Sequence, residues 1–403
     1  MKEKLFQIFF CVFIFWQPLL FSLLGESGTN LDGGIMRMVL VGIFVTSWMF
    51  YFSFSPRSIN EKKMLLILAL FGVAYYSTHY FYTNVPADAL SGYHGQMLRW
   101  GADCTSACAL GMTLPKVKNY SLIHKILPWE SIALTPFMLN AIISSAADEG
   151  QYIVTGGLNY QLLAYYMAIL FSFSLYYSFA YQKKQNIFIK AAAIVTMLVQ
   201  AVACCMSGGR GGVVLLVIYV IYMSYFMLKR HIVSKGKLIS VALASIIGFL
   251  IVANKLDMWS SSGFDRSSNL VNDDDRLLMW ESIWHYVSDN NYMPYGLGGD
   301  YFTFGFYTHN TILDWCIELG VIGAFVMCII YLKTYISIFR LSKYNEIFVI
   351  AMIIAINAVV MNMFSGYWIT TPGMWLAFGI VMKSSNYDRW HIKRVIRQKH
   401  RAL

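Results

Sequence analysis

The sequence predicts an all-α, polytopic membrane protein built from about twelve transmembrane helices. Of its 403 residues, 58% are hydrophobic and 13% are charged, whereas soluble proteins contain about 45–50% and about 25%. One aqueous core cannot hide that much apolar surface, so an array of soluble domains is excluded. The 16% of aromatic residues and the seven cysteines also exclude the disordered, collagen-like and disulfide-stapled classes.

Charge-free runs predict where the chain crosses the membrane, because a spanning helix needs about 20 mostly apolar residues. Runs free of Asp, Glu, Lys and Arg lie at 5–25, 38–56, 64–87, 131–147, 150–182, 191–209, 211–228, 238–254 and 347–382. The last run is long enough for two crossings, and the first is expected to be a retained helix, not a cleaved signal. Two further spans are predicted at 311–334, with Asp314 and Glu318 near its start, and at 96–114, with Arg99 and Asp103. We expect all of them to form a single integral membrane domain over 1–403.

The distribution of Lys and Arg predicts the orientation of these spans. With a cytoplasmic N-terminus and alternating spans, 25 of the 31 basic residues fall in cytoplasmic segments, as the positive-inside rule requires. The net charge of +10 therefore reflects topology, and we expect no nucleic-acid partner. The C-terminus is also cytoplasmic, and the basic tail 384–403 is expected to lie on anionic lipids. The six basic residues left on the outer side are Arg37, Arg99, Arg210, Lys255, Arg266 and Arg276.

A long loop on the outer side, about 255–309, separates two of the spans. Within it Leu277, Trp280, Trp284 and Val287 recur at helical spacing, which predicts a short amphipathic helix with one apolar face. The acids Asp273-Asp274-Asp275 at its start suit the helix dipole. We expect this helix to pack on the bundle or to lie along the membrane surface.

Arg210 is the first candidate for binding chemistry. It lies in Ser207-Gly208-Gly209-Arg210-Gly211-Gly212, between two charge-free runs, so it must sit at or just inside the membrane face, where it needs an anionic partner. Gly209 and Gly211, with the other glycines, permit a tight turn with exposed backbone N–H groups. The alternative interpretation is a tight helical hairpin with a snorkelling arginine. A nucleotide P-loop is disfavoured because the Lys-Ser/Thr ending is absent.

Arg276 follows the acidic triplet, so it either pairs locally with Asp273 or Asp275 or binds a phosphate. We interpret the triplet as helix capping and not as the metal site of a nucleotide-sugar transferase, because nucleotide sugars are cytoplasmic and this loop is not. The histidines and cysteines show no zinc spacing, and neither a metal nor a cofactor is expected. Gly296-Leu297-Gly298-Gly299 is interpreted as a turn and not as a dinucleotide site.

His309 ends the long loop, and Asn310 is a suitable N-cap for the span that follows. Asp314 and Glu318 come next at four-residue spacing, so with Asn310 they form a polar stripe that enters the membrane. Acids inside a membrane are functional candidates by default. A lone histidine at a helix mouth is either structural or catalytic, and the residues alone leave both interpretations open.

Together, these features resemble the O-antigen polymerase and O-antigen ligase family of bacterial inner membranes. The resemblance covers roughly 150–330 and rests on motifs in a fixed order, namely Ser207–Gly212, Asp275-Arg276-Leu277-Leu278-Met279-Trp280, Tyr295-Gly296-Leu297-Gly298, His309-Asn310-Thr311-Ile312-Leu313-Asp314, and Glu318-Leu319-Gly320 with Gly323. It implies a bundle of the GT-C glycosyltransferase type. Such an enzyme works at the periplasmic face on glycans linked to undecaprenyl diphosphate, and it needs no ATP because the donor stores the energy.

The resemblance also implies a role for each candidate residue. Arg210 and Arg276, with Arg99 as a third candidate, would bind the diphosphate leaving group, and His309 would be the general base for the acceptor hydroxyl. Asp314 or Glu318 would orient the histidine, and direct attack would invert the anomeric centre without a metal. The implied partners are the lipid-linked glycan donor and acceptor, membrane lipids and a chain-length regulator protein.

Three functions follow in order of preference. A polymerase is favoured because the glycine-rich surround of Arg210 resembles the polymerase branch, whereas ligases more often carry Thr or Ala there. A ligase that moves the finished chain to lipid A-core is the first alternative. A flippase of lipid-linked sugars is the second, and it is disfavoured because the charges gather on one face and no internal repeat is visible.

Overall fold

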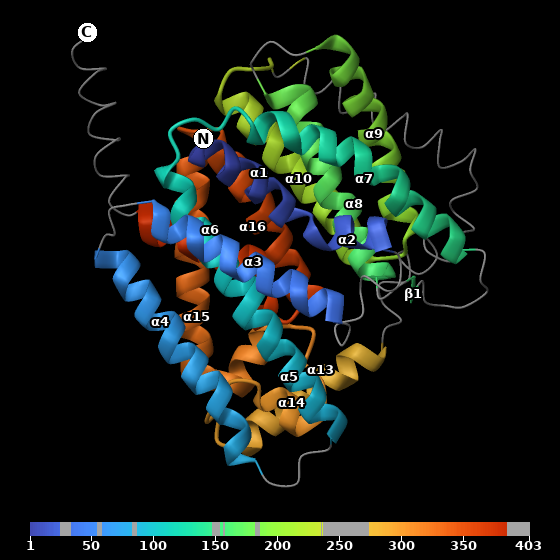
Figure 1. Cartoon of the computed structure of the whole chain (residues 1–403). Helices are drawn as coiled ribbons and strands as arrows, with labels where there is room; N and C mark the ends of the chain where they lie inside the picture. Colours follow the sequence, from blue (N-terminus) through green and yellow to red (C-terminus); the bar gives the residue numbers. More distant parts are fainter. Residues whose placement is uncertain are drawn as a thin grey trace. The chain divides into compact units, whose positions relative to one another are not determined.

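The computed structural model describes residues 1–24, 34–54, 59–82, 87–146, 154–155, 158–181, 186–234, 236 and 274–384. The chain divides into two compact units, one made of Met1–Arg37 and Tyr120–Leu277 and the other of Met38–Asn119 and Leu278–Leu403. We call them unit 1 and unit 2 and describe each by itself (Figure 1). The predicted span 238–254, residues 255–273 of the long loop and the basic tail from residue 385 lie outside the described residues. The single integral membrane domain over 1–403 stays a prediction.

The described part of unit 1 is helical apart from two short antiparallel strands, β1 and β2, in which Val154 faces Asn159 and Thr155 faces Leu158. Its elements are α1 (Lys2–Ile14), α2 (Trp16–Leu24), α7 (Ile123–Ala146), β1 (Val154–Thr155), β2 (Leu158–Asn159), α8 (Tyr160–Leu175), the π-helical segment η5 (Tyr176–Ala180), α9 (Ile187–Met206) and α10 (Arg210–Lys229). Helix α8 is the most enclosed of the candidate spans, and α7, α9 and α10 pack around it.

A buried polar network joins three helices of unit 1. Gln200 on α9 donates to the Ser131 hydroxyl at 3.0 Å and to the Thr135 hydroxyl at 2.8 Å, both on α7. Ser131 in turn donates to the carbonyl of Leu170 on α8 at 2.9 Å. Hydrogen bonds of this kind supply helix association that the hydrophobic effect cannot supply in lipid.

The described part of unit 2 consists of helices and the turns between some of them. Its elements are α3 (Gly34–Ser53, from Met38 on), α4 (Ile59–Ser77), η2 (Thr78–Phe81), α5 (Ala87–Arg99), the π-helical segment η3 (Trp100–Cys104), α6 (Thr105–Thr113), η4 (Leu114–Lys116), α13 (Asp274–Asp289, from Leu278 on), α14 (Gly299–Phe304), α15 (Thr311–Ser342), α16 (Ile347–Phe364) and η7 (Trp368–Thr370). A final helix covers 372–384.

The all-α polytopic prediction is confirmed. Among the described residues, eight helices are long and apolar enough to cross a membrane, and they coincide with eight of the twelve predicted spans. Three others take shorter forms: 5–25 is divided into α1 and α2, 96–114 runs through α5, η3 and α6, and the last crossing is η7 followed by the final helix. The fourth, 238–254, is outside the described part of the chain.

Two glycines allow α6 and the final helix of unit 2 to cross at backbone contact. A Cβ added at Gly111 would lie 2.3 Å from the carbonyl oxygen of Leu376, and one added at Gly379 would lie 2.3 Å from that of Cys108. Small residues are the usual means of close helix packing in membranes. The crossing fixes the final helix, which carries η7 at its start, against the middle of unit 2.

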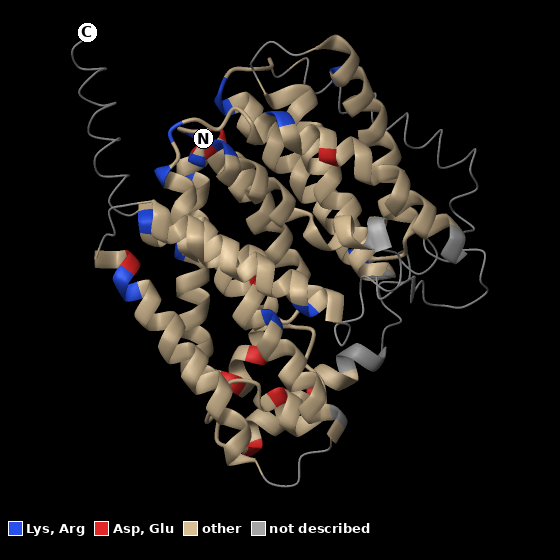
Figure 2. Ribbon diagram, in the orientation of Figure 1, with Lys and Arg blue, Asp and Glu red and all other residues tan. Residues whose placement is uncertain are grey.

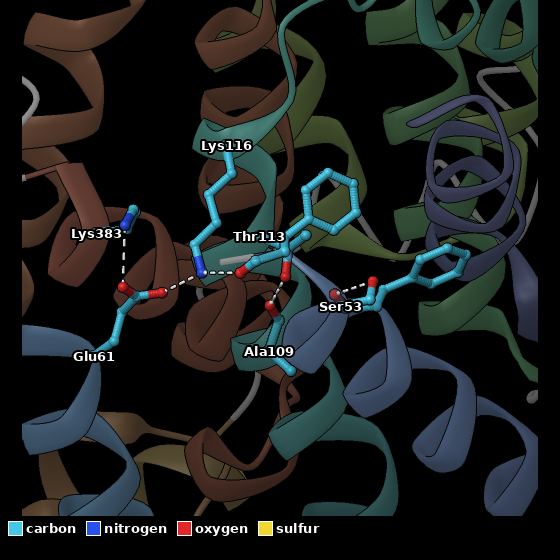
Figure 3. Close-up of polar contacts among 8 residues, drawn as sticks. Ser53, Glu61, Ala109, Thr113, Lys116 and Lys383 are labelled. Carbon is cyan, nitrogen blue, oxygen red and sulfur yellow. Dashed lines mark hydrogen bonds and ion pairs between the residues drawn. The ribbon is translucent and has the colours of Figure 1, made fainter. Parts of the chain in front are cut away.

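Glu61, at the start of α4, forms an ionic clamp with Lys116 and Lys383 (Figure 3). Its side chain is 0% exposed, and its two oxygens lie 2.5 Å from the Lys116 ammonium and 3.0 Å from that of Lys383. Lys116 also donates to the carbonyl of Phe54 at 3.1 Å and lies 4.9 Å from the centre of the Tyr51 ring. The clamp thus joins four segments that are far apart in the chain: the end of α3, the start of α4, η4 and the end of the final helix.

We predict that Gly379→Ala destabilises the protein, because the new methyl group meets a backbone oxygen that cannot move independently. Overpacking of this kind costs about 1–3 kcal/mol. Gly42→Ala on α3 is the matched control, since nothing lies within 4 Å of a Cβ there. Thermal unfolding of the purified protein in detergent should show a lower Tm for Gly379→Ala only, and equal shifts in the two variants would contradict the close crossing.

We also predict a large loss of stability for Glu61→Gln, because two mostly buried ammonium groups would lose their carboxylate. Breaking a buried ion pair from one side costs about 3–5 kcal/mol. Lys62→Gln removes an exposed charge from the next position of the same helix and should change the Tm little. A Glu61→Gln protein as stable as Lys62→Gln would show that the clamp contributes nothing.

Candidate functional site

His309 lies on a tight turn between α14 and α15, and its backbone has the left-handed φ of +56°. Few residues other than glycine adopt this region, although histidine is among those enriched there. The imidazole Nδ1 lies 3.4 Å from the carbonyl oxygen of Ser365, and the ring centre is 4.4 Å from that of Tyr307. The half-buried ring is therefore presented by a backbone conformation that its surroundings must hold in place.

Asp314 holds this turn from one helical turn below. Its Oδ1 accepts the backbone N–H of Thr308 at 3.0 Å and the Thr308 hydroxyl at 2.6 Å. Asn310 caps α15 as predicted, because its side-chain oxygen accepts from the N–H groups of Ile312 and Leu313 at 3.0 and 3.4 Å. Asp314 and Thr308 are both 0% exposed. The acid therefore acts on the residue that precedes His309.

Glu318 is buried one turn further along α15 and binds three uncharged donors. Its carboxylate accepts the backbone N–H of Gly298 at 2.7 Å, the indole N–H of Trp368 at 2.7 Å and the hydroxyl of Tyr367. These donors come from the end of the long loop and from the segment that leads into η7. Glu318 thus joins three parts of unit 2 at the base of the site.

The long loop docks into a break in α15 at Gly320, which has a φ of +70° and a ψ of 169°. The carbonyls of Ile317 and Glu318 accept N–H groups of the loop, from Tyr295 at 2.8 Å and from Gly296 at 3.1 Å. A side chain at Gly320 would lie 2.9 Å from the carbonyl oxygen of Tyr292. The glycine therefore serves two needs at once, the positive φ and the close approach of the loop.

Helix α13 confirms that the loop contains a helix that packs on its unit, but its predicted apolar face is partly wrong. Ile283 and Val287 are buried with Trp280 half-buried, whereas Trp284 is 44% exposed. The face therefore follows 280, 283 and 287 (the side chain of Leu277 lies outside the described residues). Figure 2 shows that several Asp and Glu residues of unit 2 lie at the end where α13 and α14 are, while another lies at the start of α4.

Arg99 is the last residue of α5, in unit 2, and its charge affects the Tyr307 hydroxyl. Burial raises the pKa of the Tyr307 hydroxyl, and the positive charge of Arg99 opposes that rise. The Tyr307 hydroxyl donates to the Ser365 carbonyl at 3.2 Å, which is also the oxygen nearest to the His309 Nδ1. The charge of Arg99 is thus felt at Tyr307, whose ring lies against that of His309.

Arg210 belongs to unit 1, where it is the first residue of α10. The tight hairpin of α9 and α10 is present, and its glycines fit against α8: a Cβ at Gly209 would lie 2.4 Å from that of Ala164, and one at Gly211 would lie 2.2 Å from the Tyr165 hydroxyl. Gly208 supplies the turn with a φ of +76°. The glycines around Arg210 are therefore required by packing as well as by the turn.

Arg276 falls in the first turn of α13, after Asp274 and Asp275. Its backbone is helical, and its side chain lies outside the described residues. The helix begins at Asp274, and the capping interpretation of the triplet stays a prediction because Asp273 lies outside the described residues. The structure thus places Arg99, His309, Asp314 and Glu318 in unit 2, while Arg210 lies in unit 1.

Asp300 is a buried acid near this site that belongs to none of the sequence motifs described above. It lies on α14, is 0% exposed, and its Oδ1 accepts the N–H of Tyr301 at 2.9 Å. Burial raises its pKa well above the ordinary value near 3.8, and the charges of Glu318 and Asp314 raise it further. The signal available in the sequence was one acid within an aromatic segment that begins at Tyr295 and ends at Tyr307.

Comparison with known proteins shows that part of the chain matches a known protein family. Residues 192–328 match the family model described as O-antigen ligase, which is about a third of the chain. The match confirms the resemblance to the O-antigen polymerase and ligase family. No curated protein and no solved structure matches the chain.

The O-antigen ligase match contains most of the candidate residues, including Arg210, Arg276 and His309, and it leaves out Arg99. The family supports a membrane enzyme of the glycosyltransferase-like class that acts in O-antigen and lipopolysaccharide synthesis on lipid-linked glycans. Within the described part of the chain, no group of three or more His, Cys, Asp and Glu residues is placed to hold a metal ion.

We predict that Asp300→Asn raises the stability of the protein at neutral pH. Because the pKa of Asp300 is higher in the fold than in the unfolded chain, the unfolded chain gives up this proton first, and stability falls as the pH rises from about 4. The asparagine variant lacks this loss and still accepts the Tyr301 N–H.

The gap in Tm between Asp300→Asn and the unchanged protein should be largest near pH 7 and should close as the pH approaches 4. Asp289→Asn, at an exposed position of α13, is the control and should show no such gap. Parallel curves of Tm against pH for all three proteins would contradict a raised pKa at Asp300.

Proposed function

We propose that this protein is an O-antigen polymerase, an inverting glycosyltransferase of the bacterial inner membrane. It moves a growing glycan from undecaprenyl diphosphate to the sugar of a lipid-linked repeat unit. The observation that carries the proposal is the His309 turn. A histidine in a left-handed conformation, fixed by the buried Asp314 through Thr308 and placed beside Tyr307, lies within the segment that matches the O-antigen ligase model.

In the proposed reaction, His309 accepts the proton of the acceptor hydroxyl as that oxygen attacks the anomeric carbon of the donor. The new glycosidic bond forms while the bond between that carbon and the diphosphate oxygen breaks. Negative charge then develops on the diphosphate, and arginine guanidinium groups stabilise it with charge-assisted, bidentate hydrogen bonds. No metal is required, because protons and charge are both handled by side chains.

The arginines proposed for this task are Arg99, Arg210 and Arg276. Arg99 gains weight from the structure, because its charge acts on Tyr307, beside His309, within unit 2. Arg210 is supported by the family match and by its place at the start of α10, where the helix dipole favours an anion. Asp314 is proposed to orient His309 through the Thr308 main chain. Glu318 is proposed to fix the loop and the segment at η7 that lie at the base of the site.

The proposed topology places this chemistry at the periplasmic face. Both termini are cytoplasmic, as the distribution of Lys and Arg indicates. Glu61, Lys116 and Lys383 then lie at the cytoplasmic end of unit 2, while His309 and α13 lie at the periplasmic end. A chain-length regulator is the proposed protein partner there.

A ligase is the second candidate, because the description of the matching model is O-antigen ligase. The glycine-rich surround of Arg210 favours the polymerase. The lipopolysaccharide of a deletion strain distinguishes the functions: one repeat unit on core supports the polymerase, and lipid-linked polymer without O antigen on core supports the ligase. Absence of any periplasmic lipid-linked glycan would support the flippase and overturn both enzymes.

We predict that His309→Ala abolishes long-chain O antigen and lowers kcat by about 10²–10⁴-fold, the usual contribution of a general base. Arg210→Ala and Arg99→Ala should each remove the long chains as well, because the leaving diphosphate loses a cation. Complementation of the deletion strain, with lipopolysaccharide resolved on gels and membrane insertion checked by immunoblot, measures these effects.

His285→Ala is the control for the histidine, since His285 is exposed on α13, and it should restore a normal ladder. Arg340→Ala, at the last turn of α15, is the control for the arginines. A normal ladder in His309→Ala cells would reject His309 as the base, and a normal ladder in Arg210→Ala cells would reject that arginine.

A further inference from the structure

The described contact between α13 and the His309 turn includes one directed hydrogen bond. The indole N–H of Trp280 donates to the carbonyl oxygen of Thr308 at 3.2 Å. An indole is a donor only, so this bond uses its whole hydrogen-bonding capacity. It joins two residues that are 28 positions apart in the chain.

Thr308 is the point at which the supports of the turn meet. Its N–H and its hydroxyl donate to Asp314, the hydroxyl also contacts the Asn310 carbonyl at 2.9 Å, and its own carbonyl accepts from Trp280. Asp314 therefore fixes the peptide that enters Thr308, whereas Trp280 fixes the peptide that leaves it. That second peptide is the one between Thr308 and His309.

The orientation of this peptide decides where the imidazole points. His309 has a φ of +56°, and the easiest escape from that sparsely populated region is a rotation of the Thr308–His309 peptide plane. Such a rotation would swing the Thr308 carbonyl away from its present position. The Trp280 N–H opposes the rotation, because it bonds to the oxygen that would have to move.

Helix α13 does not depend on this bond to stay in place. Ile283 and Val287 are 1% and 0% exposed, and the chain that follows them bonds to the break in α15 through Tyr295 and Gly296. Loss of the Trp280 N–H should therefore leave α13 docked and disturb only the turn. The effect on catalysis can thus be separated from an effect on folding.

We propose that Trp280 is a positioning residue for His309, whose indole N–H holds the Thr308–His309 peptide in the orientation that presents the imidazole to the acceptor. This inference rests on the proposed function, since it assumes that His309 is the base. It also gives the amphipathic helix a role in the reaction. Residues 276 and 280 are one helical turn apart on α13, so the helix that bears Arg276 is tied to the base through Trp280.

The test uses the full-length protein in liposomes with a lipid-diphosphate-linked repeat unit as donor and acceptor. Trp280→Phe keeps an aromatic ring and removes the N–H, and Trp284→Phe makes the same change at the exposed tryptophan one turn along α13. Both changes are also made in the His309→Ala background. The measurements are kcat, KM and Tm for each protein.

We expect Trp280→Phe to lower kcat about 5- to 30-fold, as a misplaced catalytic group does, with KM and Tm nearly unchanged. Trp284→Phe should match the unchanged protein. In the His309→Ala background, Trp280→Phe should cause no further loss, because a residue that acts through the base has nothing left to position. A residue that only supports the fold would lower the activity in both backgrounds.

The outcomes separate the two proposals. If His309→Ala is inactive and Trp280→Phe behaves like Trp284→Phe, the positioning role is wrong and the proposed function stands. If Trp280→Phe lowers kcat further in the His309→Ala background, the positioning role is also wrong. If His309→Ala keeps full activity, the proposed function fails. Should Trp280→Phe unfold, benzothienylalanine at position 280 replaces the N–H by sulfur in a ring of the same shape, and the same predictions apply.

Discussion

The arrangement of unit 2 depends on how the buried carboxylate of Glu318 is satisfied. An acid inside an apolar bundle is costly unless it is hydrogen-bonded, and the described bonds to Glu318 come from Gly298, Tyr367 and Trp368. These donors belong to the end of the long loop and to the segment before the final helix. One side chain therefore determines that the loop, η7 and α15 meet at one place, and the break at Gly320 provides the room for the loop.

The buried carboxylates at the two ends of unit 2 are stabilised in different ways. Glu61 is neutralised by two lysines, so its end of the unit is an ion-pair cluster that clamps four segments. Asp314 and Glu318 receive neutral N–H and O–H donors instead. Arg99 is not among the described hydrogen-bond donors to Asp314 and Glu318, so these bonds do not occupy its guanidinium group. This difference agrees with the proposal that the Glu61 end is structural and that the other end receives an anionic substrate.

Hydropathy and charge were enough to predict the eight long spans, the helix in the loop, the Asn310 cap and the polar stripe of α15. They failed where the fold depends on contacts between distant residues. The predicted apolar face of α13 includes Trp284, whereas the face that packs on unit 2 includes Ile283 instead. Both residues fit the helical period, so periodicity alone cannot decide which of them is buried. The bond from Trp280 to Thr308, the link between Arg99 and Tyr307, and the burial of Asp300 all join segments whose separation in the chain gives no local signal.

Acids within a membrane are often taken as proton carriers or ligands, but the two on α15 act here mainly through geometry. Asp314 fixes Thr308, and Glu318 fixes the loop end and the residues that follow Ser365, whose carbonyl contacts both Tyr307 and His309. The loop, the segment before η7 and α15 itself therefore all contribute to the surroundings of the histidine. The loop and the segment before η7 are both held by hydrogen bonds to the first two turns of α15. The proposed base, held in this way, would lose little freedom when the acceptor binds, which is the condition for efficient proton transfer. The polar stripe that enters the membrane therefore supports the candidate site structurally, and the proposed chemistry is assigned to the half-buried residues next to it.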